Sequence, residues 1–378
     1  MKNTKDGRNI LIIAASETDA NLYYAARFIA PDPFIFIRSK GRKYLLMNDL
    51  EVDRAKKQAH VDEVLSLSKL SGDFQKKHGK RPGMMDLIEK FLNSRGAKEL
   101  TVPHNFPISS ADALRKRGFE LQIQPDPFFE QRTVKTPEEI KFITRAIRLT
   151  EAAVAEAIQT IRKSVVRRGR LYYHGKLLTS EAVKKIINVK LMENDCIASH
   201  SIVACGIQCV DPHHEGSGPL YANESIIMDI FPRHSRSRYF ADLSRTVVRG
   251  KASPKLKKMF AAVREGQEIA FRSIRHGADG SEIHNAIQKR FEDLGFHTGT
   301  QDGRMQGFFH GTGHGLGLDI HEPPRISLGR DILKAGQVVT VEPGLYYEDA
   351  GGVRIEDDVV VTKTGCINLM KLPKILEI

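Results

Sequence analysis

Residues 310–324 read HGTGHGLGLDIHEPP, and this glycine-rich stretch directs the interpretation of the second half of the chain. Three histidines, His310, His314 and His321, fall within twelve residues and have glycines between them. Glycine has no Cβ atom, so the backbone can approach a metal ion or a substrate closely. A lone histidine is most often an ordinary core residue, but this spacing favours a binding site.

Four acidic residues stand in strand-like segments around this stretch, where a strand pattern expects an inward apolar side chain. A buried carboxylate is costly unless its charge is compensated, and a bound cation is the simplest compensation. Salt bridges to Arg245, Arg354 and surface lysines are the alternative. The acids with their segments, and the histidine that joins them, are Asp229 (IIMDIF), Asp242 (RYFADLSRT), Glu342 (VTVEPG), Glu356 (GGVRIEDDVVVT) and His314.

The acids are expected on two hairpins. One hairpin would set Asp229 across from Asp242, and a second would repeat the design with Glu342 and Glu356. Without cations, about four negative charges facing one another would repel and raise their pKa values. Two divalent cations would neutralise them, so the pattern predicts a two-metal hydrolytic centre.

The length of 378 residues predicts two domains. Between residues 10 and 130, strand-like runs (ILIIAA, FIFIRS, KYLLMN) alternate with helical patterns, including one over 81–96. The proline-rich run at 124–139 marks a boundary, which we place between an N-terminal α/β domain at 1–133 and a second domain at 134–378.

The second domain opens on a strong helix start. Thr136 is an N-cap candidate, Pro137 suits the first helical position, and Glu139 completes a capping box. Further helices are expected at about 254–276 and 282–294, with β-hairpins between and after them. The expected fold class is therefore α+β, with an antiparallel sheet and flanking helices in the second domain.

The net charge of +12 divides evenly, with +6 in residues 1–134 and +6 in the remainder. The basic clusters at 162–170 and 233–238 are interpreted as solvated surface, and no specific nucleic-acid partner is expected.

The apolar stretch at 10–15 follows Lys2 and Lys5 but is short for a signal peptide, so we expect a strand and a cytoplasmic protein. No apolar run is long enough for a membrane helix. The four cysteines show no zinc spacing and are expected as buried thiols.

The segments also resemble a known family, the pita-bread metallopeptidases, which include aminopeptidase P, prolidase and methionine aminopeptidase. The resemblance covers residues 136–378, with a plausible creatinase-like N-terminal domain before them. It rests on IVACGIQCVDPH, YFADLSRT, HGTGHGLGLDIHE, the E-P-G-x-Y motif and the G-x-R-I-E-D motif.

The resemblance implies a role for each matching residue. The metal ligands would hold two divalent ions, of which manganese suits the site and cobalt, zinc or iron are possible. Glu342, His213 and His321 would act in catalysis, the first by carrying a proton and the histidines by stabilising the tetrahedral intermediate. The implied metal ligands are Asp229, Asp242, His314, Glu342 and Glu356, and the implied substrate-binding residues are His213, His310, His321, Arg354 and Tyr239.

The implied function is an Xaa-Pro aminopeptidase, a homodimer acting through a metal-bridging hydroxide on peptides with proline at the second position. An Xaa-Pro dipeptidase (prolidase) is the alternative, and a pita-bread binding module without catalysis is a third. Methionine aminopeptidase would not need so large an N-terminal domain, and a creatinase-like hydrolase need not keep all five ligands. Three departures from the family stand out. Residues 229–232 read DIFP in place of D-x-G, and the two aspartates are spaced slightly wider than usual, which implies a longer hairpin. The basic stretch at 165–176 replaces a short connection.

Overall fold

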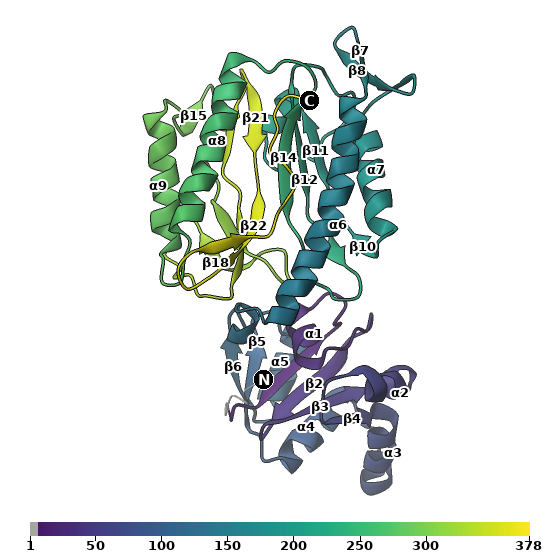
Figure 1. Ribbon diagram of the computed structural model, residues 1–378. Coiled ribbons are helices and arrows are strands. Elements are labelled where there is room, and N and C mark those ends of the chain that lie inside the picture. Colours follow the sequence, from purple (N-terminus) through teal and green to yellow (C-terminus); the bar gives the residue numbers. More distant parts are fainter. Residues whose placement is uncertain (1–6) are drawn as a thin grey trace. The chain divides into compact units, whose positions relative to one another are not determined.

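The computed structural model describes residues 7–378. The chain divides into two compact units, Met1–Glu130 and Gln131–Ile378, of which the first is described from residue 7 onward (Figure 1). Lys2 and Lys5 lie outside the described residues. The apolar stretch that follows them forms the strand β1 (Ile10–Ala14), as expected. None of the helices in the described part of the chain is long and apolar enough to span a membrane.

The first unit is built on a mixed six-stranded sheet in the order β4-β3-β2-β1-β5-β6. The residues of β1 alternate between two hydrophobic clusters, with Ile10 and Ile12 in one and Leu11 and Ile13 in the other. A sheet buried on both faces requires continuous apolar strands, which explains the run ILIIA. The other elements are α1 (Ala20–Ala26), β2 (Phe34–Ser39), β3 (Arg42–Met47), α2 (Asp49–Gln58), β4 (Glu63–Ser66), α3 (Leu67–His78), α4 (Met84–Ser94), β5 (Glu99–Pro103), α5 (Ile108–Arg115) and β6 (Glu120–Gln124).

The second unit begins with the long helix α6 (Pro137–Arg162), which starts where the sequence predicts. The Thr136 hydroxyl accepts a hydrogen bond from the Glu139 amide at 3.2 Å, and the Glu139 carboxylate accepts one from the Thr136 amide at 2.9 Å. This capping box satisfies two backbone donors that a helix start leaves unpaired. The apolar stripe of α6, including Ile143, Ile147 and Val154, is fully buried.

The other helices of this unit are α7 (Ser180–Met192), α8 (Pro254–Ser273) and α9 (Gly280–Asp293), with the short 3-10 turns η1 (Glu130–Arg132) at its start and η2 (Gly206–Val210) within it. Figure 1 shows α8 and α9 on one side of the strands and α6 and α7 on the other. The strands that carry the site belong to a three-stranded sheet, β11-β12-β14, and a five-stranded sheet, β18-β17-β19-β22-β23, both antiparallel. The strands are β7 (Val165–Arg167), β8 (Arg170–Tyr173), β9 (Lys176–Leu177), β10 (Cys196–Ile197), β11 (Ile202–Cys205), β12 (Ser225–Ile230), β13 (Arg233–His234), β14 (Leu243–Val248), β15 (Gly299–Gln301), β16 (Arg304–Gln306), β17 (Gly313–Gly315), β18 (Glu322–Ile326), β19 (Val338–Val341), β20 (Gly344–Tyr347), β21 (Gly351–Arg354), β22 (Asp357–Val361) and β23 (Cys366–Asn368).

The register of β12 and β14 corrects the expected facing pair. Asp229 lies opposite Ser244, and Asp242 lies two residues before Ser244, just ahead of β14. The shift arises because the connection between the strands is long and forms β13, which pairs with β10. Side chains two residues apart on a strand share a face. Asp242 therefore lies on the same face of the sheet as Asp229, displaced from it by two residues along the chain.

The second hairpin follows the expected design more closely. Val341 pairs with Asp357 between β19 and β22, so the next step of the register sets Glu342 beside Glu356. The hairpin β20-β21 fills the connection between them. Both acids therefore stand where two paired strands of the five-stranded sheet diverge.

The basic cluster at 233–238 is only in part the solvated surface that the sequence suggested. The Arg236 side chain is exposed and pairs with Asp195 at 3.2 Å, but His234 and Arg238 are 3% and 6% exposed. They are buried because the segment folds back as β13. Of the four cysteines, Cys196, Cys205 and Cys209 are buried, and Cys366 is half-buried; all four are free thiols.

Candidate metal centre

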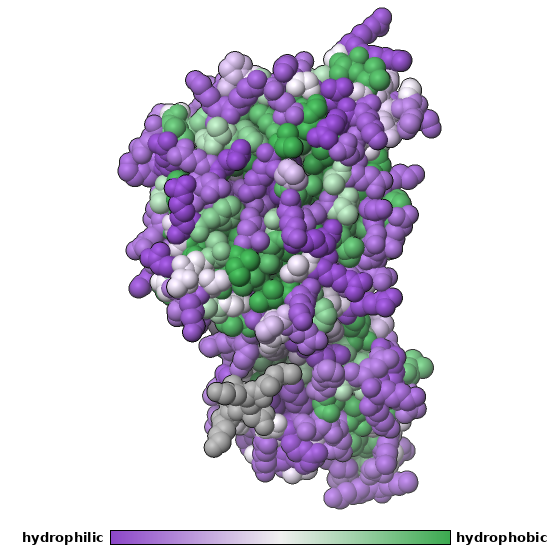
Figure 2. Space-filling model, in the orientation of Figure 1, coloured by the Kyte–Doolittle hydropathy of each residue, from purple (hydrophilic) through white to green (hydrophobic). Residues whose placement is uncertain are grey.

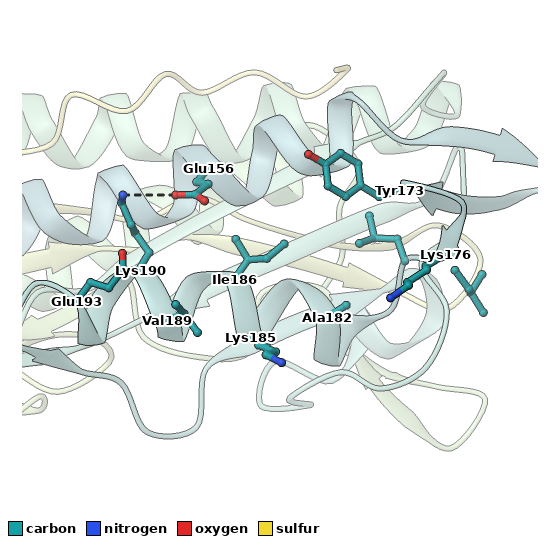
Figure 3. Close-up of a pocket in the computed structure, with 11 residues that line it drawn as sticks. Glu156, Tyr173, Lys176, Ala182, Lys185, Ile186, Val189, Lys190 and Glu193 are labelled. Atoms are coloured by element: carbon teal, nitrogen blue, oxygen red, sulfur yellow. Dashed lines mark ion pairs between the residues drawn. The ribbon is translucent and has the colours of Figure 1, made fainter.

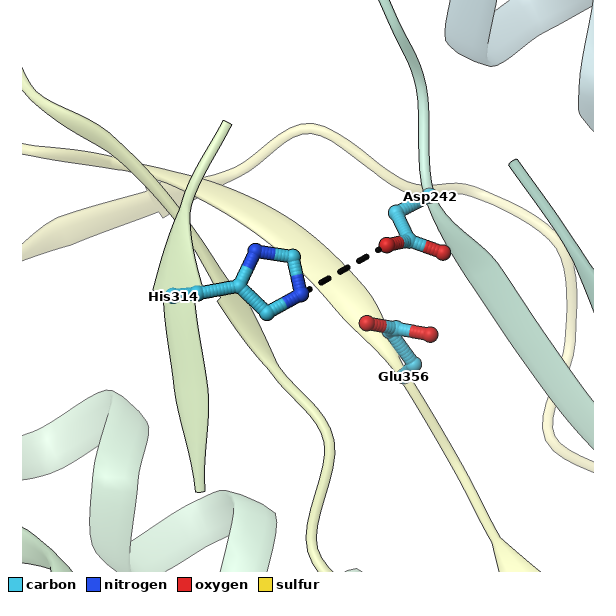
Figure 4. Close-up of side chains that lie close together, drawn as sticks. All are labelled: Asp242, His314 and Glu356. Carbon is cyan, nitrogen blue, oxygen red and sulfur yellow. Dashed lines mark ion pairs between the residues drawn. The ribbon is translucent and has the colours of Figure 1, made fainter. Parts of the chain in front are cut away.

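Three of the five predicted ligands form a compact buried group. The ligand atoms of Asp242, His314 and Glu356 all lie within 4.8 Å of one another. Figure 4 shows the His314 imidazole pointing between the two carboxylates, with 3.6 Å from its Nε2 to Asp242 Oδ2. His314 lies on β17, while Asp242 and Glu356 directly precede β14 and β22. The group therefore joins the two antiparallel sheets of the unit.

The other two predicted ligands lie next to this group. Glu342 Oε1 is 3.5 Å from His314 Nε2. Asp229, on β12, is bound by Arg354, whose Nη2 donates to Asp229 Oδ2 at 2.6 Å. The salt-bridge alternative therefore accounts for Asp229 alone among the four acids, because Arg245 pairs with Asp357 at 2.9 Å instead.

The carboxylates of this group are buried and close to one another, so their charged forms are disfavoured. Burial and then repulsion by neighbouring carboxylates raise the pKa values of Asp242 and Glu356 well above their usual range. Burial is also the main cause that raises the pKa of Glu342 to about 8. Burial lowers the pKa of His314 to about 3, with His321 adding to the effect. A neutral imidazole keeps a lone pair for a metal ion.

Two oxygens of the set have no hydrogen-bond partner. Asp229 Oδ1 and Glu356 Oε1 are buried and accept no hydrogen bond within the described part of the chain. An orphaned buried acceptor is costly, and a cation would relieve that cost. Four carboxylates with one imidazole are donors that suit manganese, iron, cobalt or zinc. The residues present therefore fit divalent metal ions.

The three predicted substrate histidines surround the group. His310 is held by Gly311 O at Nδ1 (2.8 Å) and by the Tyr346 hydroxyl at Nε2 (2.9 Å). The His321 ring lies 4.3 Å from the His314 ring and is exposed. His213 is exposed after η2, and its charge helps to lower the pKa values of His310 and His321, after burial and nearby arginines. The effect of His213 on both other histidines indicates that the three lie near one another.

A family comparison agrees with this arrangement. The sequence model of Metallopeptidase family M24 matches residues 141–363, which is more than half of the chain. The chain belongs to metallopeptidase family M24. Members of this family are peptidases, so the chain is a hydrolase, and the expected metallopeptidase class is confirmed.

Individual relatives of this M24 peptidase extend over most of its length. It is 29% identical to an Xaa-Pro dipeptidase of Pyrococcus horikoshii over 291 residues, which is 76% of each chain. The crystal structure of an X-Pro aminopeptidase from Thermotoga maritima is similar with a TM-score of 0.81 and 25% identity, covering 98% of this chain and 97% of the other. An Xaa-Pro dipeptidase from Bacillus anthracis has a TM-score of 0.81 and 26% identity over 98% and 95%. The expected α+β class with a pita-bread fold is confirmed.

Two residues that sequence reasoning gave no role lie at the centre of this M24 site. The Tyr346 hydroxyl connects His310 with Arg354, whose Nη1 is 3.0 Å away. Ser244 Oγ lies 3.0 Å from Glu356 Oε2 and accepts from Arg354 Nε at 3.1 Å. Tyr346 was visible as the tyrosine of the E-P-G-x-Y motif. Ser244 lies in the YFADLSRT motif, but only the register shows that it faces Asp229.

Tyr239 has a different environment from the one that its predicted role suggests. It is 2% exposed, and its hydroxyl donates to Glu139 Oε1 of the α6 capping box at 2.6 Å. Its ring stacks on Phe142 with 5.9 Å between the centroids. These contacts attach the segment before Asp242 to α6. A role for Tyr239 in substrate binding stays a prediction.

A further group of residues braces the histidine-rich loop of this M24 peptidase. Glu322, next to His321, accepts from Lys135 Nζ at 2.5 Å and from Arg132 Nη2 at 2.9 Å. Its side chain is 5% exposed, so both charges of each pair are largely removed from water. Removing either cation would leave a buried anion poorly compensated. The backbone after His314 is therefore fixed from its far end.

A separate groove of about 430 Å³ lies between α6, α7 and β9 (Figure 3). Its walls are mainly apolar, and Glu156 pairs with Lys190 across it at 3.7 Å. No predicted site residue lines it. The groove is therefore distinct from the metal candidates.

Proposed function

We propose that this M24 peptidase hydrolyses the bond between an N-terminal residue and a following proline, as an Xaa-Pro aminopeptidase with two divalent ions. The observation that carries the proposal is the buried group of Asp242, His314 and Glu356, with Glu342 and Asp229 beside it. The relatives named X-Pro aminopeptidase and Xaa-Pro dipeptidase support proline at the second position. Manganese is the first metal to test.

The five ligands share one role in this proposal, which is to hold the ions against the scissile bond, and Glu342 has a second role in proton transfer. Divalent ions bound there would polarise the peptide carbonyl and lower the pKa of a coordinated water. Neutral His314 and the two oxygens without partners, on Asp229 and Glu356, supply lone pairs without first breaking another contact.

Glu342 and the histidines have the chemistry of proton transfer and charge stabilisation. Glu342 Oε1 lies 3.5 Å from His314 Nε2, and a carboxylate at such a site can accept a proton from the attacking water and return it to the leaving group. We assign Glu342 the transfer of a proton to the leaving proline nitrogen, which has no N–H of its own. His213 and His321, both exposed toward the approach of a substrate, would donate to the oxygen that becomes negative.

The test combines hydrolysis with metal analysis. Wild type should cleave Ala-Pro and Ala-Pro-Xaa peptides with added Mn²⁺ and lose activity in chelator. Asp242→Asn keeps the shape of the side chain but removes the charge, and it should lose most activity and bound metal. Asp293→Asn is a matched control, because Asp293 is exposed and pairs only with Lys289 among the contacts that the structure gives. An active Asp242→Asn enzyme with full metal content would refute the proposal.

The positively charged side chain of Arg325 favours the dipeptidase alternative. Arg325, on β18, lowers the pKa values of both Glu342 and His321, which places its charge near the site. Arg354 is already engaged by Asp229 and Tyr346, whereas Arg325 is exposed. A free carboxylate of an Xaa-Pro dipeptide would find its counter-charge there. If Arg325→Met reduces kcat/KM for Ala-Pro far more than for Ala-Pro-Xaa, the enzyme is a dipeptidase.

A further inference from the structure

A basic arm projects from the second unit at the end of α6 (Figure 1). We call residues 165–177 the arginine arm. It is a three-stranded antiparallel sheet of β7, β8 and β9, joined by two tight turns. It is also the stretch where the family resemblance expected a short connection. Nothing in the proposed hydrolysis uses it.

The arm concentrates the positive charge of its unit. Residues 157–180 contain six lysines and arginines and no aspartate or glutamate, a charge of +6. Residues 135–378 as a whole also carry +6. The net charge of the second half of the chain is therefore equal to that of residues 157–180 alone, although the two halves of the chain carry the same total. Outside the arm and its flanks, the second unit is balanced.

The arginines of the arm repel one another. Arg167 lies directly opposite Arg170 in the β7-β8 register, and Arg168 occupies the turn between them. Like charges directly opposite on neighbouring strands destabilise a hairpin. All three side chains are exposed, and the structure gives none of them an ion pair within the described residues.

The turn is also built from an unfavourable residue. Arg168 has φ 50° and Gly169 has φ 76°, so both central residues are left-handed. Two-residue turns of this kind favour Asn-Gly or Asp-Gly, because a longer side chain is disfavoured at positive φ. The facing pair Arg167 and Arg170, and Arg168 in the turn, would each be expected to destabilise the hairpin, so a contribution to folding does not explain them. An anionic partner explains all three.

Phosphate fits this arrangement better than other anions. A guanidinium group binds two phosphate oxygens at once. At its arginine-bearing end the arm consists of β7 and β8 alone, since β9 pairs only with Tyr172 and Tyr173, and such a two-stranded ribbon is narrow enough to enter a major groove. A lipid surface fits poorly, because Val165 and Val166 (55% and 44% exposed) lie at the base of the ribbon and the charges at its tip. An interfacial anchor needs the opposite order, with its apolar residues deepest.

We infer that the arginine arm binds the phosphate backbone of double-stranded nucleic acid, without reading its sequence. Tyr172 lies on the same face as Arg167, 5.7 Å from its guanidinium carbon, and supports that side chain. Lys176 and Lys185, which line the groove at the base of the arm, extend the positive surface toward α7 (Figure 3). The arm would thus hold the peptidase on a polyanion.

The test is anisotropy of a fluorescein-labelled DNA duplex of about 20 base pairs titrated with the full chain at roughly 50 to 300 mM KCl. Wild type should bind with a steep salt dependence. The triple variant Arg167→Gln, Arg168→Asn, Arg170→Gln should bind on the order of tenfold or more weakly. Its slope of log K against log[KCl] should be shallower by about 2.7, or 0.9 for each lost phosphate contact.

Two controls separate charge from folding. The variant Lys258→Gln, Arg264→Gln, Arg272→Gln removes the same charge from exposed positions on α8 and should keep the wild-type slope. Arg168→Asn alone places a favoured residue in the turn, so its Tm should not fall while its affinity does. Peptide hydrolysis should be unchanged in every arm variant.

Three results would overturn the inference. Equal losses in the arm and α8 triple variants would show that only net charge matters. Stronger arm-dependent binding to poly-glutamate than to the duplex would assign the arm to an acidic protein. A change of oligomeric state in the arm variant, measured by sedimentation, would assign it to a second copy of the chain.

Discussion

The acids of the candidate metal centre make a sharp prediction about the metal-free chain. Burial raises the pKa of Glu342 from 4.5 to about 8. Between these two values the folded chain keeps a proton on Glu342 that the unfolded chain has lost. The folded state therefore binds more protons, and the free energy of unfolding must fall as pH rises. The stability is fully present below about pH 4.5 and is lost progressively up to about pH 8.

The magnitude follows from the interval between the two pKa values. At about 1.4 kcal/mol for each pH unit, it amounts to roughly 5 kcal/mol for Glu342 alone. Asp242 and Glu356, whose pKa values are also raised, act in the same direction. For a unit of this size, 5 kcal/mol corresponds to a decrease in Tm of about 10–20 °C. That is comparable to the whole stability of many domains.

Calorimetry in chelator at pH steps from about 5 to 8 measures the effect on the transition of the second unit. Glu342→Gln lacks the contribution of Glu342, so its Tm should fall less than that of wild type over the same interval, by the share that Asp242 and Glu356 still contribute. Exposed Glu268→Gln is the control and should behave as wild type. Added Mn²⁺ should raise the wild-type Tm more at high pH, because ions bind carboxylates after they lose their protons. A chelated wild type whose Tm rises or stays level between pH 5 and 8 would refute the reasoning.

Three further substitutions test single contacts. Tyr346→Phe removes the hydroxyl that links His310 to Arg354 and should lower kcat for Ala-Pro on the order of tenfold with little change in Tm; an unchanged kcat would remove Tyr346 from the site. Thr136→Ala deletes the N-cap of α6 and should cost about 1 kcal/mol in calorimetry with kcat unchanged, so an equal Tm would contradict the capping box. Lys135→Met leaves Glu322 poorly compensated and should cost about 3 kcal/mol; a more stable variant would show that burial of this pair is unfavourable.

The fold was predictable where the signals are local. The start of α6 follows from Thr136, Pro137 and Glu139, because the capping box is made within four residues of chain. The strands of the first unit follow from continuous apolar runs, which both faces of its sheet require. Such signals need no knowledge of what the segment packs against.

The contacts between distant segments were not predictable in the same way. The sequence set Asp229 across from Asp242, but the length of the connection allowed β13 to form and moved Ser244 into that place. The cluster at 233–238 was expected in water and is partly buried for the same reason. Arg354 was placed at the site, but its bond to Asp229 depends on the packing of β21 against β12.

Arg354 also bears on how many ions the site can hold. Four carboxylates and one guanidinium leave a buried charge of about −3, so one divalent ion leaves about −1 and two leave about +1. Charge alone therefore does not decide between one ion and two. Geometry does more, because Asp242, His314 and Glu356 already form one compact site. A second ion needs Asp229, whose Oδ2 is occupied by Arg354 while its Oδ1 has no partner. The salt bridge to Arg354 therefore leaves one oxygen of Asp229 without a partner, so it does not exclude Asp229 as a ligand of a second ion.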